Sequence, residues 1–326
     1  MSVNKKIIET EATVPIPEDA FNVVSYTGTG SSLSITLGFE PTLLYFKGLN
    51  ATGRGYWYYN LNGTWKYLAP AALNTEETNT PFTTSSTGIT IPYSFGINYS
   101  GLTVVLYAWK YPSSATSNTN GTITSSVQAD IDKGISQVAW TGNSSNASIG
   151  HSLGGVPELI IAKSRTVTQN WAVYNQTSGS NYWLQLNGSG AKIDEAIWQD
   201  TTPTSTLFYV NGNVVINSGN SVAWAFRSIP GLSKIGTYTG TGSSGIAVTT
   251  GFQPDLVIIK SINNPSDWYA IDSERANNKF ITLNGTATEY TASDTHTFTS
   301  TGFELSGSSY NNSGYTWIYY AVKISS

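Results

Sequence analysis

The chain has 326 residues, of which 11% are charged and 13% aromatic, with a formal net charge of −4 and no Cys. So few charges and so many aromatic residues exclude a coiled coil and a disordered chain, and the acidic balance offers no footprint for nucleic acid. The missing Cys excludes disulfides and thiolate metal sites. No apolar run approaches the ~18 residues that a membrane span needs. The composition indicates an all-β protein.

The chain begins with a short N-terminal arm, residues 1–20, which contains Pro15 and Pro17 and is too small to have its own core. Glu9 and Glu11 interrupt any apolar stretch in this arm. A signal peptide needs an uninterrupted apolar region. We therefore expect an arm that precedes the first folded unit, and no export signal.

After the arm, one set of landmarks occurs three times in the same order, the signature of an internal repeat. Each copy opens on an aromatic residue followed by Thr-Gly, continues through an apolar strand that starts at Pro and ends at Lys, and closes on an aromatic strand with a basic end. The Pro-led strands occupy residues 41–47, 157–163 and 254–260. The copies predict modules at residues 21–112, 134–229 and 230–326, with a Ser/Thr/Asn-rich linker at residues 113–133.

The periodicity within each module predicts its fold. Short runs of Val, Ile, Thr and aromatic residues alternate with turn clusters about every 8–12 residues, as in β-sandwiches. No segment shows the helical periodicity that parallel βαβ units need. We therefore predict an all-β chain of three tandem antiparallel β-sandwich modules of the jelly-roll-like type.

In the first module, residues 56–68 contain a strong signal for a two-residue hairpin turn at Asn62-Gly63. Such a turn fixes the register of the two strands. The expected pairs are Leu61 with Thr64, Asn60 with Trp65, Tyr59 with Lys66, Tyr58 with Tyr67, and Trp57 with Leu68.

Alternation along this hairpin separates a core face from a second aromatic face. Trp57, Tyr59, Leu61 and Leu68 share the expected core face. The second face carries the candidate glycan-binding residues Tyr56, Tyr58, Asn60, Trp65 and Tyr67. Sugar rings stack on such aromatic surfaces, and amides orient them. The alternative is that this face packs against a neighbouring module or a second subunit.

In the second module, residues 150–154 match G-x-S-x-G, the nucleophile elbow of α/β-hydrolases, with Ser152 as the nucleophile. The elbow needs a helix after the serine, whereas Pro157 and a strand follow here. The only other histidine besides His151 is His296, in another module. We therefore predict a turn and no catalytic serine.

Two motifs of the third module invite a chemical interpretation. Residues 240–245 match G-x-G-x-x-G, but no helix follows to bind a pyrophosphate, so we expect a hairpin turn and no cofactor. Asp272, Glu274 and Arg275 concentrate charge in a sparsely charged chain. We expect a loop salt bridge or turn cap, with a catalytic acid as the alternative. The two histidines and the Asp130/Asp132 pair do not make a metal ligand set.

The landmark set resembles a module of tail-fibre-like and other structural proteins of tailed bacteriophages, a family of domains of unknown function. The [YW]-T-G opening, the G-[FL]-x-P strand ending in Lys, a following Trp and the closing [YW]-x-A-x-K/R strand carry the resemblance. The third module fits best, with residues 251–260, Trp268 and Asp272. The second keeps the opening and residues 155–171, and the first departs most, with Asn60 expected at the place of Asp272.

The resemblance implies a non-enzymatic virion structural protein, a tail-fibre-like appendage that binds host surface glycan. Residues 1–20 would dock it to other virion proteins, and a homotrimer is expected by analogy with phage fibres. Two alternatives stay open: a capsid decoration protein that stabilises the virion, and a polysaccharide-degrading phage enzyme. A bacterial surface carbohydrate-binding protein is disfavoured because no export signal is expected. Neither nucleic acid nor membrane insertion is expected.

Overall fold

The computed structural model describes residues 16–92, 96–212, 214–242 and 245–325. It is nearly all β, with 44% strand and 1% helix in several antiparallel sheets, which confirms the predicted all-β sandwich architecture. The single helix in the described part of the chain is α1 (Val214–Asn217). None of the described segments forms a helix long and apolar enough to cross a bilayer. Of the predicted arm, residues 1–15 lie outside the described residues.

Each copy of the landmarks builds one large sheet. The first has the order β1-β8-β3-β4-β5 and consists of β1 (Phe21–Thr27), β3 (Leu43–Gly48), β4 (Tyr56–Leu61), β5 (Thr64–Leu68) and β8 (Thr103–Trp109). The third has the order β19-β27-β21-β22-β23-β24 and consists of β19 (Ser233–Thr239), β21 (Leu256–Ser261), β22 (Tyr269–Asp272), β23 (Lys279–Thr282), β24 (Tyr290–Thr291) and β27 (Thr316–Val322). In both, the closing strand lies between the opening strand and the Pro-led strand.

The second sheet repeats this order and extends it on one side. Its strands run β16-β15-β14-β13-β18-β11-β10-β9 and consist of β9 (Thr116–Asn118), β10 (Ser125–Asp130), β11 (Ile135–Thr141), β13 (Leu159–Ser164), β14 (Ala172–Asn175), β15 (Tyr182–Gln185), β16 (Ile193–Asp194) and β18 (Asn220–Phe226). The register also repeats, because Leu43, Leu159 and Leu256 each pair with the last aromatic or apolar residue of a closing strand. The three copies therefore share one topology.

The expected linker at residues 113–133 is instead part of the second module. β10 pairs with β11, and β9 pairs with β10 at the edge of the sheet. The hydroxyl-rich composition suggested a linker, yet Val127 alternates with polar residues and is buried against the module's core. A polar edge strand and a linker have similar compositions, and only the pairing separates them.

A small sheet covers the outer face of each large sheet. The three small sheets consist of β2 (Leu33–Thr36), β6 (Thr83–Ser85) and β7 (Gly88–Ile91); of β12 (Ala147–Gly150) and β17 (Leu207–Val210); and of β20 (Ile246–Thr249), β25 (His296–Thr299) and β26 (Gly302–Leu305). Each encloses an outer core that belongs to one module.

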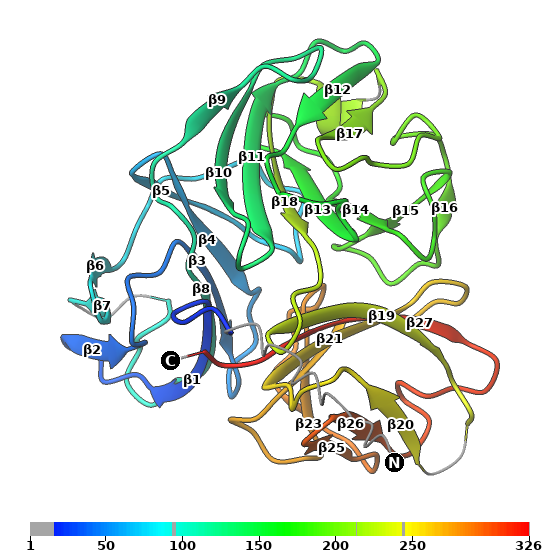
Figure 1. Ribbon diagram of the computed structural model, residues 1–326. Helices are drawn as coiled ribbons and strands as arrows, with labels where there is room; N and C mark the ends of the chain where they lie inside the picture. Colours follow the sequence, from blue (N-terminus) through cyan, green and yellow to red (C-terminus); the bar gives the residue numbers. More distant parts are fainter. Residues whose placement is uncertain (1–15, 93–95, 213, 243–244, 326) are drawn as a thin grey trace, which may run out of the picture.

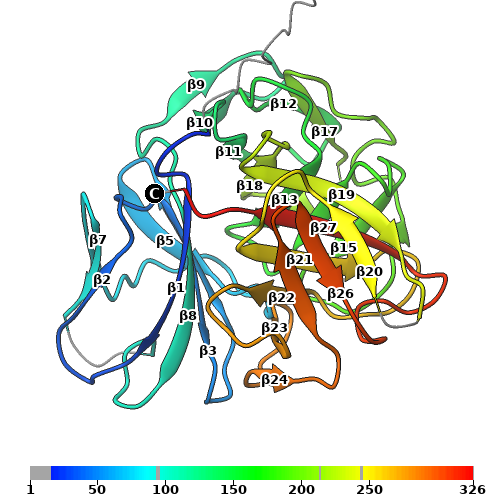
Figure 2. The same cartoon turned by 60° about the horizontal axis from the view of Figure 1, so that its bottom comes forward.

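The inner faces of the three large sheets meet around one centre, and Figures 1 and 2 show the modules side by side around it. The central core contains buried residues of all three modules. Trp57 of the first module contacts Trp224 of the second at 5.4 Å between ring centroids, and Phe226 contacts Tyr320 of the third at 5.2 Å. Each module thus completes its own outer core but shares its inner core with the other two.

The chain closes this arrangement at its ends. Ser325, just after β27, donates its backbone N–H to the carbonyl oxygen of Phe21 at 3.1 Å. The Ser325 hydroxyl accepts a 2.7 Å hydrogen bond from the backbone N–H of Ala20. The third module is therefore fastened directly to the beginning of the first, as the red and blue ends in Figure 1 show.

The Thr-Gly landmark has a steric reason. A Cβ at Gly28 would lie 2.3 Å from the carbonyl oxygen of Tyr99, and a Cβ at Gly240 would lie 2.0 Å from that of Asn312. Only glycine permits such an approach of two backbone segments.

Candidate functional site

The predicted aromatic hairpin forms, but its second face is largely covered: Tyr58 and Asn60 are buried, and Tyr56, Trp65 and Tyr67 are partly exposed. The register of β4 and β5 matches the predicted pairs throughout, and Trp57, Tyr59 and Leu68 lie in the central core as expected. On the second face, Tyr58 is fully buried, and the rings of Tyr58 and Trp65 lie 5.2 and 5.0 Å from that of Phe82.

The prediction of an exposed glycan-binding face on this hairpin is therefore corrected. Phe82, just before β6, and the small sheet of the same module cover this face. Tyr56 and Tyr67 are partly buried in the same outer core. The sequence shows a hairpin with aromatic residues on both faces, and two covering layers explain that pattern. The covering layer comes from the same module and not from a neighbour.

Asn60 is buried and belongs to the seam between the first and second modules. Its Oδ1 accepts a hydrogen bond from Gly63 N at 2.7 Å, and its carbonyl oxygen accepts one from Gln137 Nε2 at 2.8 Å. The expected equivalence with Asp272 is wrong by one residue: Leu43 pairs with Tyr59 as Leu256 pairs with Asp272. Tyr59 therefore occupies the place of Asp272.

The charged motif of the third module forms a buried ion pair, as the preferred interpretation expected. Arg275 donates from Nε to Asp272 Oδ2 at 2.8 Å, and Asp272 is fully buried. The hydroxyl of Tyr107 in the first module donates to the same oxygen at 2.7 Å. Burial opposes the charge of Arg275, but its contacts with Tyr107 and Asp272 outweigh this and raise its pKa. Glu274 is exposed and accepts a hydrogen bond from Ser25 N.

The lysine that ends each Pro-led strand is fully buried and donates a hydrogen bond to a backbone carbonyl of a neighbouring module. Lys47 donates to Gly285 O of the third module at 3.0 Å, Lys260 to Ser189 O of the second at 3.2 Å, and Lys163 to Leu73 O of the first at 3.4 Å. Burial lowers the pKa of all three lysines to about 8. The threefold Lys landmark was visible in the sequence, but its role as a clamp between modules was not.

A polar groove of about 610 Å³ lies where the first module meets the second. The turn of the β4–β5 hairpin forms one wall, and the inner face of β9, β10 and β11 forms the floor. Its polar lining residues are Asn62, Thr64, Thr116, Ser117, Thr124, Ser125, Ser126, Thr141, Arg165 and Asn220, and its apolar ones are Leu61, Ala115, Ala139 and Trp140. Half of these polar residues lie in the segment interpreted as a linker, so sequence reasoning missed them; the alternation at residues 125–130 was the available signal.

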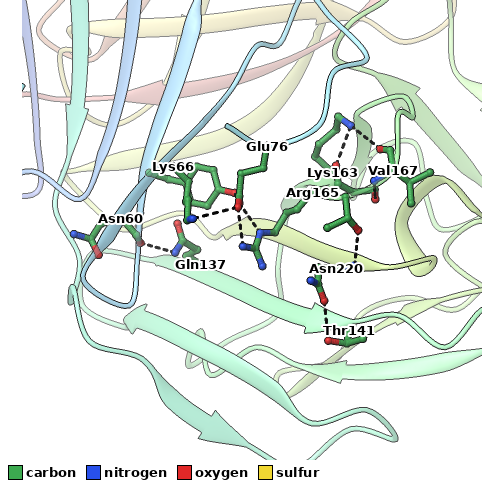
Figure 3. Close-up of polar contacts among 12 residues, drawn as sticks. Asn60, Lys66, Glu76, Gln137, Thr141, Lys163, Arg165, Val167 and Asn220 are labelled. Carbon is green, nitrogen blue, oxygen red and sulfur yellow. Dashed lines mark hydrogen bonds and ion pairs between the residues drawn. The ribbon is translucent and has the colours of Figure 1, made fainter. Parts of the chain in front are cut away.

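Arg165 of the groove lining belongs to an ion-pair cluster, which Figure 3 draws. Arg165 binds the carboxylate of Glu76 through Nε at 2.5 Å and Nη2 at 2.9 Å, and Lys66 lies 3.8 Å from the same carboxylate. The Tyr59 hydroxyl also donates to Glu76. The third guanidinium nitrogen of Arg165 points away from Glu76 in Figure 3. Nearby, the Thr141 hydroxyl donates to Asn220 Oδ1 at 2.9 Å.

The G-x-S-x-G segment lies in a turn between β12 and β13. Ser152 accepts a 2.8 Å hydrogen bond from Asn118 Nδ2. His151 accepts from Leu153 N through Nδ1, and its Nε2 lies 3.1 Å from Thr204 O. Burial lowers the pKa of His151 to about 4. Both ring nitrogens are thus used by the backbone, and the next element is a strand.

The other two sequence motifs do not assemble a site among the described residues. The glycine-rich match at 240–245 includes residues 243–244, which lie outside the described part, and strand β20 follows it. In the described chain, no three His, Asp or Glu side chains lie close enough together to hold a metal ion.

One protein family matches the chain. The family model described as "Domain of unknown function (DUF7483)" matches residues 16–324, a span that contains all three modules. No curated protein and no solved structure shows significant similarity to the chain.

Proposed function

Since the chain belongs to the DUF7483 family of domains of unknown function, we propose its role from its sequence pattern and geometry: a non-enzymatic structural protein of a bacteriophage virion. It forms part of a tail-fibre-like appendage on the particle surface. Residues 1–20 attach it to other virion proteins.

The observation that carries this proposal is the single central core shared by three modules of one chain. Three buried lysine clamps and the contact between Tyr107 and Asp272 join the modules across their seams. Buried hydrogen bonds of this kind make a fold more rigid and more specific. Such a body suits a particle exterior, where a protein resists heat and dilution without a ligand or metal.

The acids considered for catalysis support a structural role. Asp272 is fully buried and binds both Arg275 and Tyr107. A glycosidase acid must reach the glycosidic oxygen of its substrate. Glu274 is exposed and accepts a hydrogen bond from the backbone N–H of Ser25 in β1.

A homotrimer remains part of the proposal as an association of whole chains. The inner faces of the large sheets already meet within one chain, so copies would associate through outer surfaces or through the arm.

Capsid decoration is the second candidate. The modules are arranged around a centre and not in a row (Figures 1 and 2). A compact body of this kind fits a surface lattice as well as it fits a thin fibre.

Imaging of intact particles labelled with an antibody against this chain tests the proposal. Label on the tail supports the appendage, label on the capsid supports decoration, and particles free of the chain overturn the virion proposal. Deletion of residues 1–20 should abolish incorporation into particles. Incubation with host polysaccharide, followed by product analysis, tests the enzyme alternative: released oligosaccharides would contradict a non-enzymatic role.

A further inference from the structure

We propose that the groove between the first and second modules binds a neutral saccharide. This inference rests on the proposed function only for the source of the saccharide, the host surface. The binding itself is a property of the isolated chain.

The groove is a departure from the threefold repeat. In the first and third sheets, the opening strands β1 and β19 are edge strands, whereas β11 is followed by β10 and β9. These two added strands extend the floor beyond the shared core, and the β4–β5 turn stands opposite them. Sites that break an otherwise consistent pattern are where function is expected.

The floor of the groove is made of small side chains. Ser117, Ser126 and Ala139 are neighbours on adjacent strands, so two hydroxyls and one methyl group lie side by side there. Asn220 and Thr141 continue it along the next strand pair. The volume of about 610 Å³ lies within the roughly 300–1,000 Å³ of small-molecule sites.

The chemistry of the lining selects the ligand class. Serine and threonine hydroxyls both donate and accept hydrogen bonds, and amides do the same with separate atoms. A saccharide presents hydroxyls of the same dual character, so it reproduces the bonds of the water that it displaces. The charge of Arg165 is largely used by Glu76, which favours a neutral ligand over an anion.

A peptide fits this groove less well. Extended peptides bind by adding a strand to a free sheet edge. The floor here is the face of β9, β10 and β11. The backbone groups of β10 and β11 are already paired on both sides, and the edge strand β9 is only three residues long. The floor presents side-chain hydroxyls, which can form hydrogen bonds with the hydroxyls of a saccharide.

The test is saturation-transfer NMR on the purified full-length chain. The probes are short oligosaccharides of glucose, galactose, mannose and N-acetylglucosamine, used up to about 10 mM. Ser126→Trp and Ser117→Trp each place an indole on the floor, since both serines are exposed. The matched control is Thr297→Trp, on an exposed strand position of the third module.

We expect at least one probe to bind the unaltered chain and the Thr297→Trp variant equally. Each groove variant should weaken that binding at least about tenfold, one decade in dissociation constant, with an unchanged melting temperature. Binding that survives both groove substitutions overturns the assigned site. Absence of binding by all the probes overturns the saccharide class. Neither failure touches the virion proposal, which depends on where the chain lies in particles.

Discussion

The hydroxyl of Tyr107 in the first module donates a 2.7 Å hydrogen bond to the carboxylate of Asp272 in the third, across 165 positions of sequence. Arg275 binds the same carboxylate, so one buried acid joins a strand of one module to a turn of another. Removing one partner of such a pair leaves a buried charge without compensation. The seams between modules should therefore respond strongly to the loss of single polar atoms.

Tyr107→Phe removes only this hydroxyl. We expect the free energy of unfolding to fall by about 1.5–3 kcal/mol, the usual contribution of a hydrogen bond to a charged group. Tyr290→Phe is the control, because Tyr290 is 40% exposed and should change stability by less than about 0.5 kcal/mol. Urea unfolding followed by tryptophan fluorescence measures both, and equal stability of the two variants would contradict the clamp.

Lys260→Met keeps the length of the buried side chain but removes its donors to Ser189 O and Ser266 O. We expect a loss of about 1–3 kcal/mol in the free energy of unfolding, because buried acceptors lose a partner. Lys323→Met, at the partly exposed end of the closing strand, should be close to neutral. The same melting temperature for the two variants in calorimetry would contradict a stabilising role of Lys260 at the seam.

The buried lysines predict a rise in stability at alkaline pH. Burial lowers their pKa from 10.5 to about 8, so between these values the unfolded chain binds more protons than the folded one, and the free energy of unfolding increases with pH. Above about pH 10 the trend reverses. Burial raises the pKa of Tyr45, Tyr111 and Tyr320, so tyrosines ionise first in the unfolded chain.

Urea midpoints between pH 7 and 11 would show this maximum. Lys260→Met should reduce the rise by about a third, since one of three equivalent groups is lost. A urea midpoint that stays constant or falls between pH 8 and 9.5 would contradict the lowered pKa values of the three buried lysines.

Acid should weaken the fold before most carboxylates titrate. Burial lowers the pKa of His151 and His296 from 6.5 to about 4, so the unfolded chain takes up protons from pH 6.5 downward while the folded chain does not. The free energy of unfolding should therefore fall between pH 6.5 and 4 with a slope near two protons. His296→Gln should halve the slope, and an unchanged slope would show that His296 titrates normally in the folded chain.

The modules themselves were predictable because their landmarks are local. The turn at Asn62-Gly63 sets the register of β4 and β5, and every predicted pair forms. Alternation then placed Trp57 and Tyr59 correctly toward a core. The shared centre was not predictable, because a contact such as Trp57 with Trp224 joins residues that no local pattern connects.

The candidate site failed for two physical reasons. Tyr58 belongs to a strand that is covered on both faces, so its ring packs in the outer core of the first module and is not part of an exposed surface. The groove lies instead on strands rich in Ser and Thr, whose composition is that of a linker.

The equivalence of Asn60 and Asp272 failed because Gly55 stands in the first module where Trp171 and Trp268 stand in the others, and a Cβ there would lie 2.2 Å from the Tyr45 hydroxyl oxygen. The strand aligns correctly only through its pairing.

Because the three modules belong to one chain, their seams can evolve separately. An assembly of identical subunits repeats each substitution at every interface, so a change that opens one interface opens them all. Here β9 and β10 lie beside the seam between the first and second modules, while Lys47 and Lys260 join the modules at the other two seams. A change at one seam can therefore be tolerated, because the contacts at the other two seams still hold the three modules together.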